Sequence, residues 1–319
     1  MGHVTVVGRT FAGVAAAVRL ARVGHDVTLV DTPGGAAAMR AALGDTLDFP
    51  APWRDLFKKS GRPAAGALGL HGLDLVADPD GPPTERAATW YADVDALGES
   101  AARAWRDLVD AADDIWQAVR PLGLEAELTP DAVARAGLHP RRSLEDVART
   151  LDHPVLAERV RAVARARGLE PAAAPAWFSS RLAVERTFGR WRLQDVEGRP
   201  APASGLVDVL EDRLAERGVT LTTDPAATAG ADAVVDTVDP GMTWRRPSRW
   251  SRRDSFPDQL LARPALRDPR RPGWFHASAS SPGGSEPWAQ LLSGALATYA
   301  AHEFLTGDDI RPTNKALAR

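Results

Sequence analysis

The hydrophobic positions of this chain follow a strand period, then a helix period, then a strand period again within the first 31 residues. The β-branched run 3–7 predicts a buried strand that ends at Gly8. Small and apolar residues over 11–21 predict a helix, which Gly24 ends, and the run 26–31 predicts a second strand. This strand–helix–strand order with short connections is typical of a dinucleotide-binding fold.

Farther along, the pattern predicts a helical stretch between two parts that contain strands. Apolar residues three and four apart between Trp105 and Leu122 indicate one amphipathic helix. Shorter helices are expected from Pro130, after the N-cap Ser143 and from Pro154. Strands return at 190–196, 219–223, 233–238 and 273–279, with helices after Ser204 and from Pro287. We therefore expect an α/β fold, in which a mostly helical region interrupts a Rossmann-type domain.

The turn after the first strand has the spacing of a dinucleotide fingerprint. Gly8, Thr10 and Gly13 match G-x-G-x-x-G, with threonine in place of the second glycine. The first glycine allows a tight turn, the third allows close packing, and the helix N-terminus attracts phosphate. Asp31 lies where an acidic side chain accepts ribose hydroxyls. The candidate cofactor-binding residues here are Gly8, Arg9, Thr10, Phe11, Ala12, Gly13, Asp31, Gly34 and Gly35.

A second glycine turn lies near the end of the chain. The segment 280–285 is rich in serine and glycine and leads into the helix expected from Pro287. Its candidate cofactor-binding residues are Ala277, Pro282, Gly283 and Gly284. Such turns at both ends suit an extended cofactor, which favours FAD over NAD. A protein that binds NAD is an alternative, and Asp31 would then repel the 2′-phosphate of NADP.

Composition excludes several classes of protein. The chain has 319 residues, which is compatible with two domains, and a formal net charge of −3. It has no cysteine, so disulfides, thiolate nucleophiles and Cys-ligated metals are excluded. The seven histidines are scattered without metal-ligand spacing, so no metal site is expected and the catalytic residues are unknown. No run is apolar enough to span a membrane, and we expect a cytoplasmic protein.

The segment 245–271 contains nine arginines and three aspartates. With two interleaved tryptophans it has features of a nucleic-acid or phosphate-binding surface. The alternative is a solvated connecting segment whose arginines pair with acidic residues elsewhere. We favour the second interpretation and expect no nucleic-acid partner, because the whole chain is not basic.

Four stretches resemble the phytoene desaturase-like family of FAD-dependent oxidoreductases, which is related to the amine oxidases. They are 6–31, 46–62, 186–218 and 274–315, and the most specific parts are Ser278-Ala279-Ser280-Ser281-Pro282-Gly283-Gly284 and Gln290-Leu291-Leu292-Ser293-Gly294-Ala295. The resemblance implies FAD, with pyrophosphate near 8–13, ribose at Asp31 and flavin contacts near 277–284. It also implies a Rossmann-type FAD-binding domain with an inserted, mostly helical, reduced substrate domain. The implied activity is hydride transfer between flavin and a small apolar or amine-bearing substrate.

The domains implied are a FAD-binding domain at 1–60, 189–240 and 272–319, a helical substrate domain at 61–188, and a short remnant of the substrate domain at 241–271. This chain departs from the family at Thr10, at Ala36 in place of an arginine, and at Ala277 in place of a glycine. The segments 223–232 and 240–272 are also short for the family. The leading hypothesis is the FAD-dependent oxidoreductase, and these departures motivate the alternative, a non-catalytic homologue that keeps the fold as a binding or accessory protein. The oligomeric state is not predicted.

Overall fold

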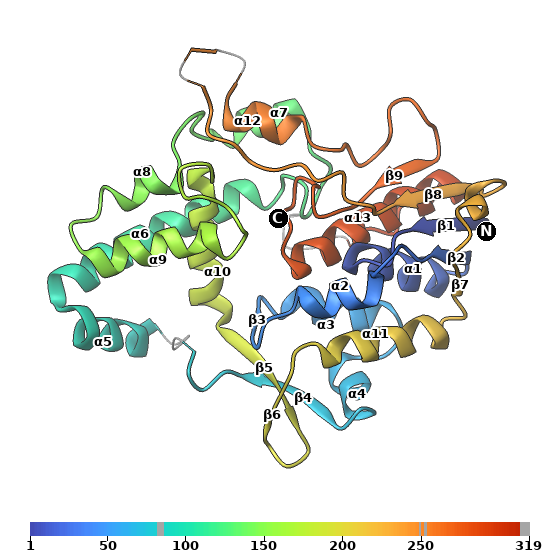
Figure 1. The fold of residues 1–319 in the computed structure, drawn as a ribbon, viewed down its shortest axis with the longest axis horizontal. Coiled ribbons are helices and arrows are strands. Elements are labelled where there is room, and N and C mark those ends of the chain that lie inside the picture. Colours follow the sequence, from blue (N-terminus) through green and yellow to red (C-terminus); the bar gives the residue numbers. More distant parts are fainter. Residues whose placement is uncertain (82–85, 249, 252–253, 313–319) are drawn as a thin grey trace, which may run out of the picture.

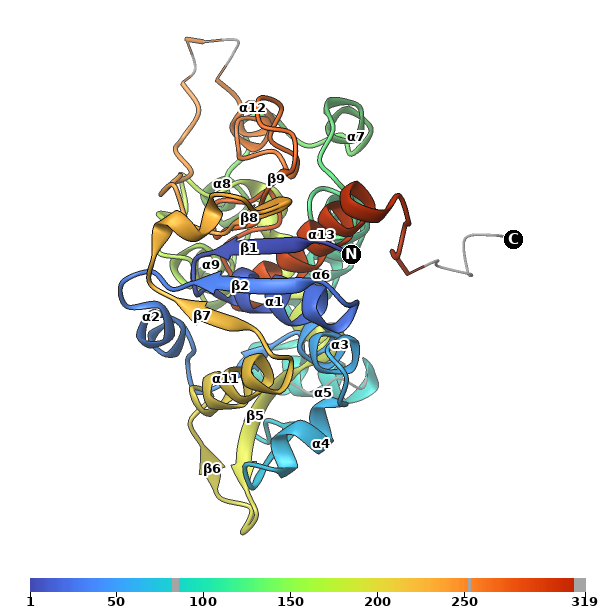
Figure 2. The ribbon, with the colours of Figure 1, turned by 90° about the vertical axis from the view of Figure 1, so that its right-hand side faces the viewer.

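The computed structural model describes residues 1–81, 86–248, 250–251 and 254–312, and its centre is a five-stranded parallel sheet (Figure 1). The strand order is β7-β2-β1-β8-β9. The strands are β1 (His3–Val7), β2 (Asp26–Val30), β7 (Thr220–Thr222), β8 (Ala233–Asp236) and β9 (Trp274–His276). Figure 2 shows these strands side by side. The order places β1, the first strand, in the middle of the sheet.

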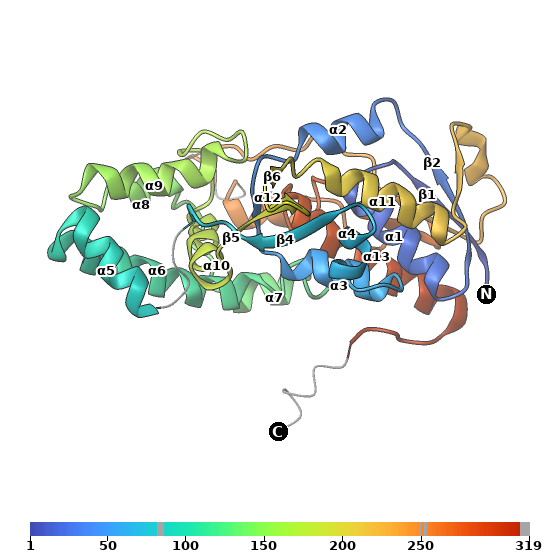
Figure 3. The same ribbon diagram turned by 90° about the horizontal axis from the view of Figure 1, so that it is seen from below.

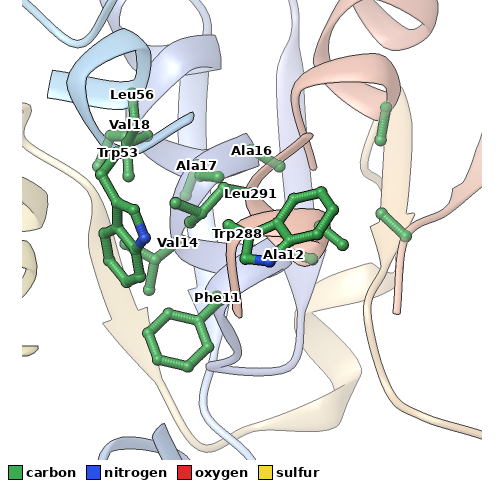
Figure 4. Close-up of a cluster of buried hydrophobic side chains, with 14 of the residues drawn as sticks. Phe11, Ala12, Val14, Ala16, Ala17, Val18, Trp53, Leu56, Trp288 and Leu291 are labelled. Carbon is green, nitrogen blue, oxygen red and sulfur yellow. The ribbon is translucent and has the colours of Figure 1, made fainter. Parts of the chain in front are cut away.

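Two helices from opposite ends of the chain pack together beside this sheet. They are α1 (Phe11–Arg22) and α13 (Pro287–Thr306). Ala15, Ala16 and Ala17 are fully buried, and small side chains allow the two helix backbones to approach closely. Figure 4 shows Phe11, Trp53 and Leu291 in the core that α1, α13 and α3 (Ala51–Lys59) form. The N-terminal and C-terminal parts of the chain therefore share one hydrophobic core.

A second, antiparallel sheet lies below the first in Figure 1. It consists of β3 (Leu47–Asp48), β5 (Arg190–Asp195), β4 (Leu73–Ala77) and β6 (Pro200–Ala201). The strand predicted at 190–196 therefore exists, and it joins this sheet and not the parallel one. Helix α4 (Ala64–Gly69) packs against β4 and against α11 (Gly205–Glu216), and α11 also contacts α2 (Gly35–Ala41).

The longest unbroken run of helices lies between β4 and β5. They are α5 (Arg86–Leu97), α6 (Glu99–Val119), α7 (Pro130–Arg135), α8 (Leu144–Ala148), α9 (Pro154–Arg165), η1 (Ala176–Ser179) and α10 (Ser180–Phe188). Figure 3 shows α5, α6, α8, α9 and α10 at one end of the molecule and the parallel sheet at the other. The short elements η2 (Pro225–Thr228) and α12 (Phe256–Leu261) complete the described fold.

This arrangement is an α/β fold of Rossmann type with a mostly helical insertion, as the sequence predicts. The domain boundaries given above stay predictions. Within the described residues, no helix is both long and apolar enough to cross a membrane.

Candidate functional site

The strands of the parallel sheet bring four connections to one edge. Because β1, β2, β8 and β9 are parallel, their carboxyl ends point the same way. Gly8 follows β1, Asp31 follows β2, Thr237 follows β8 and Ala277 follows β9. The strand order reverses direction between β1 and β8, and ligands of such sheets bind in the crevice at this point. The structure thus places most of the predicted cofactor residues at the edge where a nucleotide is expected.

The turn between β1 and α1 keeps the backbone of a phosphate-binding turn. Gly8 has φ 103°, and a Cβ added at Gly13 would lie 2.0 Å from the Gly8 carbonyl oxygen, so both positions require glycine. Thr10 is the N-cap of α1, and its hydroxyl accepts the Gly13 N–H at 3.0 Å. The same hydroxyl donates to Thr237 Oγ1 at 3.0 Å. The Thr10 hydroxyl therefore already accepts a hydrogen bond from one of the free N–H groups at the N-terminus of α1.

Arg9 occupies the position next to the acidic residue that is predicted to hold ribose. Its guanidinium lies 2.9 Å from Asp31 Oδ2, and its Nε donates to Glu211 Oε1 of α11 at 3.0 Å. Gly35 packs against this pair, because a Cβ there would lie 2.7 Å from Arg9 Cβ and 2.5 Å from Asp31 Oδ1. Asp31 Oδ1 is buried and has no hydrogen-bond partner among the described residues. Asp31 therefore has one oxygen bound to Arg9 and one unpaired acceptor.

The turn that the resemblance assigns to flavin is packed against the helical insertion. Ala277, Ser278, Ser280 and Ser281 are at most 2% exposed. A Cβ added at Gly283 would lie 2.8 Å from Leu124 Cδ2 and 2.9 Å from the Gly123 carbonyl oxygen (residue pair 123–124). Gly283 is thus in close contact with Gly123 and Leu124 of the helical insertion, within the turn that the resemblance assigns to flavin.

Aromatic side chains fill the space at the start of α13. The ring of Trp288 lies 5.1 Å from that of Phe49 and 6.2 Å from that of Trp116, in edge-to-face geometry. Both tryptophans are at most 5% exposed. The backbone at residues 8–13 therefore has the form of a diphosphate-binding turn, whereas Ala277, Ser278 and Trp288 are buried within the protein. The binding of FAD stays a prediction.

A cavity of about 490 Å³ lies within the helical insertion and reaches β3 and the start of α13. Its volume is in the range of small-molecule sites. Side chains of α5, α6, α9 and α10 form most of its wall, together with Asp48 of β3 and Trp288 of α13. The polar and aromatic side chains that line it are Asp48, Thr89, Trp90, Asp93, Trp105, Arg106, Arg159, Arg167, Arg181, Glu185, Arg186, Arg190 and Trp288.

Two carboxyl groups in this wall have perturbed acidities. Burial raises the pKa of Asp48, although neighbouring guanidinium groups act in the opposite direction. Burial also raises the pKa of Glu185, and the negative charge of Asp48 adds to that increase. Perturbed carboxyl groups that line a concave pocket are a physical signature of functional sites. The cavity is therefore the second candidate site of this chain.

A buried ion cluster joins this cavity to α13. Glu286, the N-cap residue of α13, contacts Arg181 Nε at 2.7 Å and also binds Arg167. Burial opposes ionisation of Glu286, but the charges of Arg167 and Arg181 outweigh it and lower its pKa to about 2. All three side chains are at most 15% exposed. The cluster therefore connects α13 to the helical insertion by charge-assisted hydrogen bonds.

The described part of the arginine-rich segment makes ion pairs and stacking contacts. Arg267 pairs with Glu303 at 2.6 Å and Arg245 pairs with Asp254 at 2.9 Å. Arg263 is buried and lies over the Trp244 ring. Residues 249, 252 and 253 lie outside the described residues. The pairs of the described arginines agree with the interpretation of a connecting segment, and the absence of a nucleic-acid partner stays a prediction.

Sequence reasoning did not identify Asp48, Glu185, Glu211 or Glu286. Glu286 had a usable signal, because an acidic residue directly before Pro287 is typical of a helix start. The other three come from separate elements and acquire their partners only in the fold. Among the described residues, no group of three or more His, Asp or Glu side chains is arranged to hold a metal ion.

Comparisons with known proteins add little to this geometry. No protein-family model matches the chain, and no curated protein matches it. A crystal structure of a RAB GDI from Plasmodium falciparum is similar to it, with 10% sequence identity and a TM-score of 0.37. The similar region covers 74% of this chain and 66% of that protein, so the chain spans just under two thirds of the neighbour's length.

Proposed function

We propose that this chain is a ligand-binding protein that keeps a Rossmann-type scaffold of the flavoprotein kind and works without flavin, using the cavity in its helical insertion as its ligand site. The observation that carries the proposal is the contact between Gly283 and residues 123–124, which packs the turn assigned to flavin against the helical insertion. Arg9 also supports the proposal. It lies at the opposite end of the sheet edge from Gly283, and its guanidinium is bound to Asp31 and Glu211.

A second candidate is the FAD-dependent oxidoreductase that the resemblance implies, acting on a small apolar or amine-bearing substrate. Asp31 Oδ1 favours this candidate, because it is a buried acceptor without a partner among the described residues. A ribose hydroxyl would satisfy it, since an unpaired buried oxygen costs about 1–3 kcal/mol. The required glycines at positions 8 and 13 also fit this candidate.

The response of the wild-type chain to FAD separates the two candidates, and Arg9→Ala tests whether Arg9 blocks the nucleotide position. We expect the wild-type chain to show no change in melting temperature with ADP or FAD. We expect the variant to gain a concentration-dependent rise with ADP alone, because loss of the guanidinium frees Asp31 Oδ2 beside the unpaired Oδ1 and a ligand stabilises the native state it binds. The measurement is a thermal-shift titration.

Arg40→Ala is the matched control, because Arg40 pairs with Asp208 of the same helix α11 on the exposed surface. It should leave the response to ADP unchanged. A rise in melting temperature of the wild-type chain with FAD, accompanied by flavin absorbance in the purified protein, would support the oxidoreductase and refute the proposal.

A further inference from the structure

The cavity in the helical insertion is lined by more positive than negative side chains. Three carboxylates line it, and they are Asp48, Asp93 and Glu185. Six arginines line it, and they are Arg106, Arg159, Arg167, Arg181, Arg186 and Arg190. A concave surface lined mainly by one sign of charge attracts ligands of the opposite sign. This wall therefore favours a negatively charged ligand.

The surplus of positive charge is buried. Three of the arginines each lie near a carboxylate, and these pairs are Arg159 with Asp93 at 3.3 Å, Arg186 with Asp110 at 2.5 Å and Arg190 with Asp78 at 3.5 Å. Arg167 and Arg181, by contrast, share the single carboxylate of Glu286. The side chains of these two arginines are only 9% and 12% exposed. Two buried guanidinium groups thus have one buried carboxylate between them.

The other carboxylates of the wall offset this charge only in part. Asp48 is exposed, and the Glu185 side chain is 39% exposed. Water screens such charges, whereas buried charges act through a lower effective dielectric constant. Burial lowers the pKa of Arg181, and among the groups that oppose this, Glu286 has the largest effect and Asp48 the smallest. A ligand group beside Arg181 therefore meets a positive side chain.

Arg181 has hydrogen-bond donors that the protein does not use. Its Nε donates to Glu286 Oε1 at 2.7 Å, and its Nη2 lies 3.4 Å from the Gly283 carbonyl oxygen. In the part of the chain that the structure describes, no acceptor lies within hydrogen-bond distance of Nη1. The Trp288 ring lies 4.4 Å from the guanidinium carbon and covers one face of the group. Arg181 is thus held in place while the donors of Nη1 stay available in a side chain that lines the cavity.

Much of the remaining wall is apolar. Val109 of α6, Val163 of α9, and Leu182 and Val184 of α10 line the cavity, and each is at most 9% exposed. Trp105 of α6 adds an aromatic surface. These side chains can pack against an aliphatic or aromatic body but offer it no hydrogen-bond partner. A ligand that uses both parts of the wall is therefore amphipathic.

We propose that the cavity binds an organic carboxylate with an apolar body, whose carboxylate group accepts hydrogen bonds from Nη1 of Arg181 and whose body packs against Trp105 and the aliphatic side chains of the wall. This inference rests on the proposed function, because it uses the cavity as the ligand site. The planar guanidinium matches the geometry of a carboxylate. Because Glu286 and Trp288 already fix this guanidinium, little conformational freedom is lost on binding.

Titration calorimetry with indole-3-propionate at pH 7.5 tests the inference, and tryptamine, of similar shape and opposite charge, is the comparison. We expect saturable binding of the acid and no binding of the amine. Arg181→Gln should weaken binding of the acid by about tenfold or more, because it removes the charged donor. Trp105→Ala should weaken it by about fivefold or more, because it removes apolar contact area and leaves Arg181 in place.

The matched control is Arg103→Gln, which removes an exposed guanidinium of α6 that does not line the cavity. It should leave the affinity for the acid unchanged. The thermal melting curve of each variant shows whether it is folded, and Trp105→Ala decides the test if Arg181→Gln is not.

The inference is overturned if tryptamine binds more tightly than indole-3-propionate, or if the deciding variant binds the acid like the wild type. It is also overturned if neither indole-3-propionate nor octanoate binds to the folded chain. Failure of the proposed function has a different sign, because it would be the binding of FAD by the wild-type chain.

Discussion

Replacing Glu286 with alanine should lower the free energy of unfolding by about 3–5 kcal/mol, the cost of breaking a buried ion cluster by removing one partner. Glu286 is the partner of both Arg167 and Arg181, which are 9% and 12% exposed. Without it, two guanidinium groups remain buried near each other with no carboxylate between them. The N-terminus of α13 also loses a favourable negative charge. Urea denaturation at pH 7 measures the change.

The matched control is Glu99→Gln, which removes a carboxylate from an exposed pair with Arg103 on α6. It should change stability by less than about 0.5 kcal/mol, because exposed pairs contribute little. A loss of similar size in both variants would show that the buried cluster has no special role.

The stabilisation by Glu286 should also depend on pH. The folded-state pKa of about 2 lies below the ordinary value of 4.5, so the contribution is present above pH 4.5 and is lost as the pH falls toward 2. The stability of Glu286→Ala should therefore fall less between pH 5 and pH 3 than that of the wild-type chain.

The second large effect is expected at Gly294, where α13 crosses α1. A Cβ at this position would lie 2.3 Å from the Ala12 carbonyl oxygen. Because that atom belongs to the helix backbone and cannot rotate away, the two helices must separate. We expect Gly294→Ala to destabilise the chain by roughly 3 kcal/mol, the upper part of the usual range for overpacking. The change would appear as a lower denaturation midpoint in urea.

Gly69→Ala is the control for this prediction. Gly69 ends helix α4, and a Cβ there would meet no atom within 4 Å. Alanine should be neutral or slightly stabilising there, because it restricts the unfolded chain. If Gly294→Ala were equally neutral, this result would contradict the close contact between α1 and α13 at Gly294.

The sequence predicted the elements whose residues have a strong local pattern. The strand 3–7 and the helix that begins at Phe11 are confirmed. Ser143 does cap a helix, and its hydroxyl and the Asp146 carboxylate form a capping box. Pro130 and Pro287 begin helices as expected. Local rules succeed here because caps, prolines and hydrophobic periods act over a few residues.

Other elements escaped prediction because their pattern is weak or their partners are distant. The strand β4 lies in a stretch of weak periodicity and is defined by its pairing with β5 more than 100 residues later. The helix after Ser204 is confirmed as α11, but the Ser204 side chain makes no capping hydrogen bond, so the reason given for its start was wrong. The strand β4 depends on tertiary contacts, which a single sequence does not reveal.

For the candidate site too, the sequence predicted the features that have local causes and missed those that depend on distant residues. The glycine spacing predicted the tight turn at Gly8 and Gly13 correctly, since the steric reason is local. The interaction of Arg9 with Glu211 could not be predicted, because it depends on the position of α11 beside the turn. The pair of carboxyl groups at Asp48 and Glu185 arises from β3 and α10 meeting at one cavity. The sequence therefore indicated a nucleotide edge, and only the fold revealed the cavity.

The central claim is that the flavin end of the edge is closed by protein, and equilibrium dialysis of the purified chain against FAD tests it most directly. We expect no FAD to be retained above the level of a protein without a nucleotide site, because Gly283 contacts residues 123–124 and Trp288 is buried among aromatic rings. Retention of one FAD per chain at micromolar concentration would contradict the account.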